Sequence, residues 1–569
     1  MLLDDEHFHA AGVPHRELGG YFETEESGHS VAVFPILKEL RYLIPFRPPA
    51  ETIQFLRDWA DESGERLAVL GDDGEKFGVW PDTYKTVFEE GWLREFLSLL
   101  RENREWLHLT TPARWMRQHS PRGLVYLPSL SYHEMGEWAL PTSAQGAFHA
   151  LADREAASPA SLPFVRGGFW RNFLSKYPES NRMHKRAQDL SSRIRELPEP
   201  QQERPLDLLW QAQCNCAYWH GVFGGLYLPH LRDAIHRRLL QAESAVFEAR
   251  GVDLGARELE LRGPEGAAWL LHNDHVSLAV APQRGGMLLE WGDRRTGHDL
   301  QNTLARRTEG YHARLLAEAS GGGDPGQPAS IHDRTRVKEA GLERLLGEDR
   351  LPRSSFQDHF LEPGLGAAEF RRALEAASSG FAGMPYEAHL GWEQGRVVLE
   401  LHREGFFAGT PSALRVTKVF TLLRGDAGFE LVYRVEQLEG PPVRCEFAVE
   451  CNVTFLTAAA MDRWIEIGPG MNRVGMGHEG LFEGVGRLRL GDEWLNLGVE
   501  LDIEEPSRLG LWPVETVSLS EDGFERNYQG TCMAFAWPLQ LEAGGMREFR
   551  FEARHAALVA AAPLAPGRA

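Results

Sequence analysis

The chain has 569 residues, of which 43% are hydrophobic and 25% are charged, a globular composition with room for several domains. It carries 61 Lys and Arg against 82 Asp and Glu, a formal net charge of −21, which argues against a general nucleic-acid-binding protein because phosphate binding depends on Lys and Arg. No apolar run approaches the roughly 18–20 residues that span a bilayer, nothing resembles a signal peptide, and five cysteines are too few for a disulfide framework. We therefore expect a cytoplasmic protein whose partners include neither nucleic acid nor membrane.

Residues 1–145 alternate short apolar segments with amphipathic ones. The amphipathic segments include residues 52–59 and 84–100, where apolar residues recur at helical spacing. The apolar segments have the character of strands and lie at residues 2–3, 31–36, 67–70, 107–109 and 124–127. This alternation predicts a parallel sheet covered by helices.

Residues 146–250 contain almost only helical patterns, the clearest at residues 180–195 and 229–250. We expect a small helical bundle here, with the Pro, Glu and Gln residues around 198–205 separating two of its helices.

From residue 251 to residue 557 the apolar period changes to two. In the segment 443–453 the odd positions carry Val, Cys and Phe, whereas most even positions are polar. Many such strands with Gly-rich turns predict a large antiparallel sandwich with one solvated face. We expect a mobile loop at residues 321–326 and a disordered tail at residues 558–569.

The densest candidate site is the segment Gly-Asp-Asp-Gly-Glu-Lys-Phe-Gly-Val-Trp-Pro at residues 71–81, directly after the predicted strand 67–70. It brings the carboxylates of Asp72, Asp73 and Glu75 close to Trp80 along the chain. In a barrel, catalytic side chains collect on the loops that leave the C-terminal ends of the strands. A carboxyl group beside a Trp suits acid–base chemistry on a sugar whose apolar face stacks on the ring. A solvated Asp-Gly turn without function is the alternative.

A second candidate segment covers residues 212–230 and contains two cysteines and two histidines. These are Cys214, Cys216, His220 and His230. Their C-x-C spacing lacks the usual C-x2-C partner pair of a zinc site, so we expect no metal here. The segment fits better a loop that presents Tyr218, Trp219 and His220 to a cleft.

Two further segments follow predicted strands. Residues 131–141 bring Glu134, Glu137 and Trp138 together, in a pattern that also suits an ordinary strand-to-helix loop. His7 and His9 follow the first predicted strand, and surface histidines without function are the alternative there.

Together these segments resemble glycoside hydrolase family 57, in the branch of 4-α-glucanotransferases and α-amylases. The resemblance is carried by three long motifs in the expected order, at residues 72–81, 131–138 and 213–225. Shorter matches extend it over nearly the whole chain, at residues 40–48, 176–181 and 355–360.

The resemblance implies the C-terminal part of a (β/α)7-type catalytic barrel over residues 1–145, a helical middle domain and a galactose-mutarotase-like β-sandwich. It implies retaining chemistry on α-1,4-glucans and maltooligosaccharides, for which two carboxyl groups lie about 5–5.5 Å apart. Asp73 matches the family's acid/base. The family's substrate contacts correspond to Trp80, Trp138, Trp219 and His220, with Asp72 and Glu75 in support. This mechanism needs no metal or other cofactor.

Two departures from the family pattern bear on activity. Cys216 stands where the family often has Asp, and a thiol does not supply a carboxylate's charge. The family's nucleophilic glutamate lies upstream of the stretch that residues 2–8 resemble, so we expect the N-terminal part of the barrel to be missing. A barrel without its first units would expose an apolar surface and an unpaired strand edge.

We expect an α-glucan enzyme, either a 4-α-glucanotransferase or an α-amylase, represented without its nucleophile. Three explanations of the gap remain: a start placed too late, a second polypeptide that completes the barrel, or a vestigial barrel. The alternatives in function are a non-catalytic glucan-binding protein and one part of a split enzyme. The sandwich packs against the barrel, binds glucan or forms a homodimer, and the sequence leaves these roles open.

Overall fold

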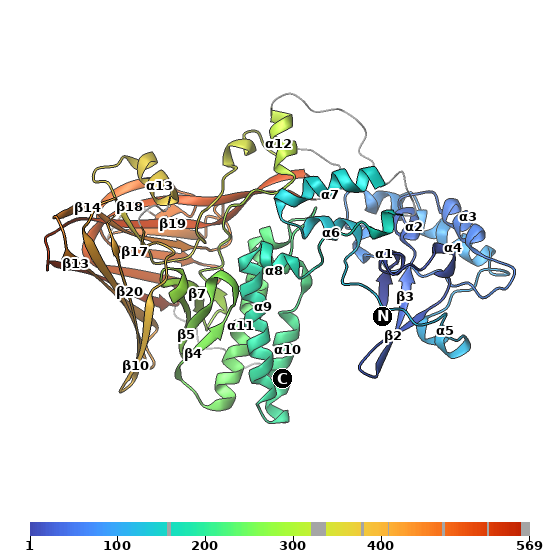
Figure 1. Ribbon diagram of the computed structural model, residues 1–569, viewed down its shortest axis with the longest axis horizontal. Coiled ribbons are helices and arrows are strands. Elements are labelled where there is room, and N and C mark those ends of the chain that lie inside the picture. The colour runs from blue at the N-terminus through green and yellow to red at the C-terminus, as the bar shows by residue number, and fades with distance from the viewer. Residues whose placement is uncertain are drawn as a thin grey trace, which may run out of the picture.

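The computed structural model describes residues 1–155, 161–319, 337–376, 380–407, 409–468, 473–520 and 523–558. Three regions follow one another along its long axis (Figure 1). An α/β region lies at one end, two antiparallel sheets lie at the other, and a group of helices stands between them. The expected loop at 321–326 and all but the first residue of the expected tail lie outside the described residues.

The N-terminal region is built on a sheet of three strands. Strand β1 (Leu2–Asp4) pairs in parallel with β3 (His29–Ile36), and β2 (Phe22–Glu26) pairs antiparallel with the other edge of β3. Apolar residues of these strands and of the helices around them form a common core. The helices are α1 (Asp5–Ala10), α2 (Lys38–Leu43), α3 (Pro49–Trp59), α4 (Trp92–Glu102), α5 (Pro112–Gln118), α6 (His133–Trp138) and α7 (Thr142–Glu155).

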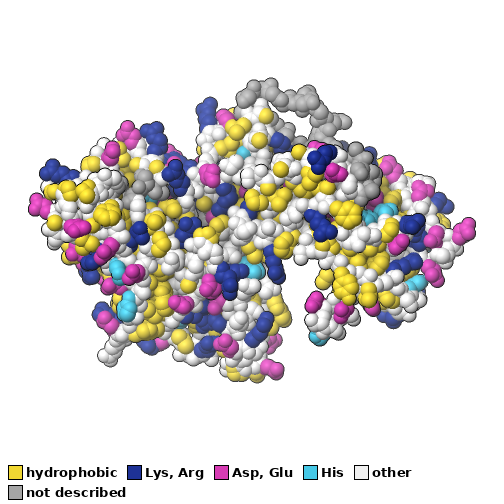
Figure 2. All heavy atoms as spheres, viewed as in Figure 1, with side chains coloured by type: hydrophobic (Ala, Val, Ile, Leu, Met, Phe, Trp, Pro, Cys, Tyr) yellow, Lys and Arg dark blue, Asp and Glu magenta, His cyan; other side chains and the backbone are white. Residues whose placement is uncertain are grey.

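Three of the strands expected in this region do not form. Residues 67–70 run beside β3 with a single hydrogen bond to its end, from the Leu37 amide to the Val69 carbonyl at 3.0 Å. Leu124 makes one isolated bridge with Glu23, and residues 107–109 are irregular. The physical reason is the lack of strand pairing: none of these segments joins a continuous ladder, and Leu109 and Leu124 point largely into solvent. Figure 2 shows hydrophobic side chains gathered on the surface of the N-terminal region.

The middle region consists of packed helices, as the sequence predicts. Proline occupies the first turn of each of the three longest, where its missing N–H costs no hydrogen bond. The last of them ends at Gly251, whose φ of 63° suits glycine at a helix C-terminus. The helices are α8 (Asn172–Lys176), α9 (Pro178–Arg195), α10 (Glu199–Gln211) and α11 (Pro229–Arg250).

The C-terminal region contains a five-stranded and a twelve-stranded sheet that share one large apolar core. The smaller sheet is antiparallel throughout and comprises β4 (Leu254–Glu260), β5 (Ala267–Asn273), β6 (Val276–Ala281), β7 (Met287–Asp293) and β8 (His298–Asp299). The larger comprises β9 (Gln357–Leu361), β10 (Glu387–Glu393), β11 (Arg396–Phe406), β12 (Ala413–Leu423), β13 (Gly428–Glu439), β14 (Val443–Val453), β15 (Arg463–Ile467), β16 (Arg473–Gly475), β17 (Gly480–Asp492), β18 (Leu497–Ser520), β19 (Gly523–Leu541) and β20 (Met546–Ala556).

The expected solvated face is present on some strands and absent on others. Strand β12 alternates buried and half-buried residues along most of its length. Strand β14, from which the period was deduced, is buried on both faces except at Arg444. Helix α13 (Ala367–Ala376) covers the second face of this part of the sheet and places Phe370 and Leu374 against Ala448.

None of the helices in the described ranges combines the length and the apolarity that crossing a bilayer requires.

Candidate functional site

The chain segments that follow β1, β3 and residues 67–70 meet at one place. Asp4 ends β1, Arg41 lies on the helix after β3, and Asp72 follows residue 70. The Arg41 guanidinium bridges the two carboxylates, with its Nη1 3.4 Å from Asp4 Oδ2 and its Nε 3.4 Å from Asp72 Oδ1. Lys76 Nζ lies 2.7 Å from Asp72 Oδ2. Asp72, whose side chain is 5% exposed, is thus a charge-paired carboxylate that anchors the loop.

Asp73 directly follows Asp72, and it is exposed to solvent. Its backbone N–H donates to Asp72 Oδ1 at 3.0 Å, and a short 3-10 turn, η2 (Gly74–Lys76), begins immediately after it. Asp73 and Glu75 are both exposed. The anchored backbone therefore holds Asp73 at a fixed place on the surface, where its carboxyl group can reach a ligand.

The loop of Asp73 faces the two other motif segments. Burial is the main cause that raises the pKa of Cys216, and the negative charges of Glu75 and Asp73 raise it further. Burial likewise raises the pKa of Tyr132 well above its usual range, and the charges of Glu134, Asp73 and Asp4 add to this effect. Contacts join the same segments: the Arg41 guanidinium, which pairs with Asp72, lies 5.7 Å from the Tyr132 ring centroid, and Trp138 stacks on Trp219.

Trp80 forms one side of this region together with an aromatic residue from another segment. Its ring stacks on that of Phe46, with centroids 6.1 Å apart and planes 22° apart. The Lys76 ammonium lies 5.3 Å from the Phe46 centroid and 5.4 Å from that of Trp80, within the range of a cation–π contact. Phe46 is exposed and Trp80 half-buried, so the pair offers apolar ring surface beside Asp73's loop.

Trp138 and Trp219 stack on each other but differ in exposure. Their centroids are 5.9 Å apart with planes 21° apart, and Trp138 is half-buried. Trp219 is only 4% exposed because Phe173 and Phe223 pack on it as well. Trp219 is therefore enclosed by three aromatic rings and packs against Trp138, and its expected sugar contact stays a prediction.

His220 is also buried and is held by hydrogen bonds within the protein. Its Nδ1 lies 3.0 Å from the carbonyl oxygens of Phe223 and Gly224, and its Nε2 lies 2.8 Å from the Tyr311 hydroxyl. Burial lowers the pKa of His220 to about 4, so the ring is neutral at pH 7. These hydrogen bonds hold His220 against the turn that follows Trp219, and its expected sugar contact stays a prediction.

The cysteines and histidines of the segment 212–230 do not form a metal cluster in the described chain. Cys214 and Cys216 lie at the surface, and His230 is exposed at the start of α11. His220 is engaged on both ring nitrogens.

Arg41, Phe46 and Tyr132 belong to the site although sequence reasoning did not single them out. Arg41 and Phe46 lie within the short match at residues 40–48, which was the available signal. The Arg41 guanidinium lies over the Tyr132 ring, 5.7 Å from its centroid, in a cation–π contact. Tyr42, on the same helix as Arg41, donates to Glu134 Oε1 at 2.7 Å and so joins α2 to the start of α6.

Three family models match consecutive parts of the chain. Residues 1–128 match glycosyl hydrolase family 57, residues 168–246 match the middle domain of α-amylase/4-α-glucanotransferase, and residues 269–551 match the C-terminal domain of the same proteins.

Similarity over nearly the whole of this chain agrees with these matches. Alpha-amylase 1 of Dictyoglomus thermophilum is 36% identical over 561 residues, which cover 96% of this chain and 77% of that protein. The 4-alpha-glucanotransferase of Thermococcus kodakarensis is 35% identical and is matched over 97% of this chain and 78% of its own. The crystal structure of 4-alpha-glucanotransferase from Thermococcus litoralis superposes with a TM-score of 0.78 at 33% identity, over 97% of this chain and 77% of that one.

Proposed function

Because the chain belongs to glycoside hydrolase family 57, in its α-amylase/4-α-glucanotransferase branch, we propose that it acts on α-1,4-glucans with Asp73 as the acid/base. The observation that carries the proposal is that the three motif segments adjoin one another: Arg41 pairs with Asp72 and lies over the Tyr132 ring, and Trp138 stacks on Trp219. Asp73 is exposed on a loop that the buried pair Asp72–Lys76 anchors. A general acid needs such fixed placement next to the departing oxygen.

The surroundings of Asp73 suit a sugar chain. The Phe46–Trp80 pair and Trp138 offer aromatic surface on which the apolar faces of glucose units can stack. In the proposed cycle, the Asp73 carboxyl group protonates the leaving glycosidic oxygen. The resulting carboxylate then takes a proton from the incoming water or sugar hydroxyl. The proposal covers both hydrolysis and transfer, which differ only in that acceptor.

A retaining mechanism also needs a carboxylate nucleophile. We assign that role to no residue of the described chain, since Asp72 is buried and paired with two cations. The proposal is therefore limited to the acid/base and the binding surface.

Asp73→Asn tests the proposed role of Asp73. In the enzyme with a complete barrel, we expect turnover of maltoheptaose to fall by at least roughly 100-fold, the usual contribution of a general acid–base group. The kcat/KM for α-maltosyl fluoride, which reports the first step alone, should fall much less, because fluoride leaves without a proton. Asp153→Asn, at an exposed position on α7, is the matched control and should leave both activities unchanged.

Two results would count against the proposal. Equal losses of kcat/KM on both substrates would remove Asp73 from the acid role. Binding of maltoheptaose without any change in its chain length, by the wild-type protein, would instead favour a glucan-binding protein without turnover.

A further inference from the structure

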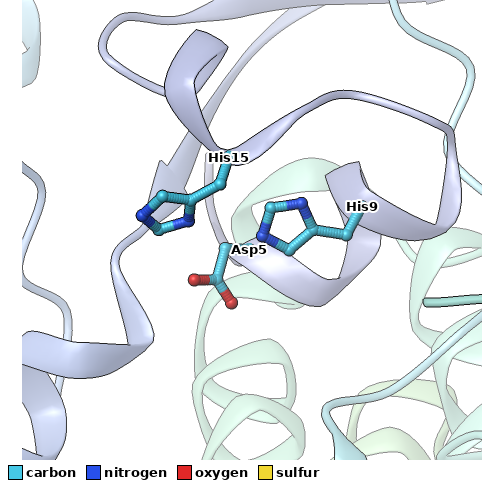
Figure 3. A group of neighbouring side chains, drawn as sticks. All are labelled: Asp5, His9 and His15. Carbon is cyan, nitrogen blue, oxygen red and sulfur yellow. The ribbon is translucent and has the colours of Figure 1, made fainter. Parts of the chain in front are cut away.

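Two histidines and an aspartate meet beside the first strand (Figure 3). Asp5 begins α1 and His9 lies four residues later, on the same face of the helix. His15 belongs to the short turn η1 (His15–Glu17), which follows the loop after α1. One donor atom from each of the three side chains lies within 4.8 Å of the others.

The two imidazole rings are oriented as metal-binding histidines usually are. His9 Nδ1 lies 3.0 Å from the carbonyl oxygen of Val13, so its Nε2 carries the free lone pair, and Figure 3 shows a His9 ring nitrogen directed toward Asp5. His15 Nε2 lies 4.0 Å from Glu39 Oε1, which leaves Nδ1 for the cluster. In metal sites the second ring nitrogen is typically held by a carbonyl or carboxylate, as the Val13 carbonyl holds His9 Nδ1, whereas the 4.0 Å between His15 and Glu39 is an ion-pair distance.

Asp5 supplies a buried negative charge at the same place. It is 3% exposed, and its Oδ2 accepts the backbone N–H of Lys38 at 3.1 Å. The Lys38 ammonium lies 2.7 Å from Glu6. The Asp5 carboxylate is therefore a buried oxygen donor beside the two imidazole rings.

We propose that Asp5, His9 and His15 bind one divalent transition metal ion, with Zn²⁺ the best match. Two imidazole nitrogens and one carboxylate oxygen are ligands that zinc takes readily, with water in the fourth position. The His15 side chain is 44% exposed and gives the ion access from solvent. The metal would tie α1 to η1 across the loop 11–14 and so fix the helix that starts directly after Asp4.

The test uses protein without a histidine tag, freed of metal by a chelator and titrated with zinc chloride in a calorimeter. We expect one equivalent of tight binding, and binding at least tenfold weaker in His15→Ala and in Asp5→Asn. Asp5→Asn retains an oxygen that can accept the Lys38 N–H. His29→Ala, at an exposed position on the β2–β3 hairpin, removes a histidine elsewhere and should bind as the wild type does.

A spectroscopic readout separates this site from loose surface binding and from misfolding. Co²⁺ bound by two imidazoles, a carboxylate and a water should give visible absorption that zinc abolishes. The unfolding temperature should rise on adding zinc in the wild type and not in His15→Ala. Zinc binding in His15→Ala and Asp5→Asn as tight as in the wild type would overturn the proposal, and so would wild-type protein that takes up no stoichiometric metal.

Discussion

Trp80 and Trp219 show how the same residue type takes two roles in this protein. Trp80 pairs with the exposed Phe46, whereas Trp219 is enclosed by Trp138, Phe173 and Phe223. Both belong to motifs that resemble the same family, so motif membership did not separate them. The difference arises from tertiary packing, which brings residues from several helices around Trp219.

Alanine at these two positions should therefore affect different properties: glucan binding at Trp80 and stability at Trp219. Trp80→Ala should weaken maltoheptaose binding by about 1–2 kcal/mol, roughly 5- to 30-fold, through the lost apolar contact, and leave stability nearly unchanged. Trp219→Ala should cost about 3–5 kcal/mol of stability, because it opens a cavity in the helical core. Calorimetric binding and the unfolding temperature measure the two effects. Destabilisation by Trp80→Ala equal to that by Trp219→Ala would contradict this assignment.

The residues of the site were predictable where the motif itself places them on a loop. Asp73 and Glu75 are exposed and Trp80 is half-buried, as a loop at residues 71–81 indicates, and their roles stay predictions. Arg41 was not predictable, because its role depends on Asp4 and Asp72 approaching it from two other segments. Spacing along the chain carries no information on such a bridge.

Among the secondary-structure elements, the apolar periodicity predicted those helices and strands that tertiary packing also stabilises. Helices α9 and α11 form where their apolar stripes face a shared core, and β12 alternates as expected. The apolar segments at 67–70 and 107–109 do not form strands, since a strand also needs a neighbour to pair with. The second buried face of β14 was not foreseen either, because α13, which covers it, is distant in the sequence.

The role of α13 can be tested through Phe370, which is fully buried against the sheet. Phe370→Ala should cost about 3–5 kcal/mol locally, the usual result of removing a buried aromatic ring. Hydrogen exchange in β14 and β19 should speed up, while exchange in α1 and α3 stays unchanged. Arg372→Ala, an exposed position on the same helix, is the control. Unchanged exchange in β14 after Phe370→Ala would mean that α13 does not stabilise this face.

Across the whole molecule, buried ionisable groups join the helices to the sheets. Arg186 on α9 bonds to Glu243 on α11 and to Glu290 on β7, at distances of 2.9 to 3.2 Å. His298 Nδ1 lies 2.7 Å from Asp233 Oδ1, which joins β8 to α11. Such pairs are costly to break singly, so the helical and sheet regions should unfold with strong coupling.

Buried histidines at this junction make its stability depend on pH. Burial lowers the pKa of His236 to about 4 and that of His272 to about 3, from an ordinary value near 6.5. A histidine whose pKa is lowered by folding takes up its proton on unfolding, so its stability contribution is complete above about pH 6.5 and declines as the pH falls toward 4. His298 has the opposite sign, because Asp233 raises its pKa above the ordinary value, and this offsets part of the effect.

We therefore expect the unfolding temperature to fall between pH 7 and pH 5, and His272→Leu to reduce that dependence. His272 stacks on Phe247 of α11 at 3.6 Å between ring centroids, so protonation there would charge the helix–sheet contact directly. Removing one such histidine should lower the slope of stability against pH by up to about 1.4 kcal/mol per unit. The slope is compared rather than the absolute stability, since the substitution also changes packing. His29→Leu, at an exposed position, should leave the slope unchanged, and an unchanged slope in His272→Leu would show that acid sensitivity arises elsewhere.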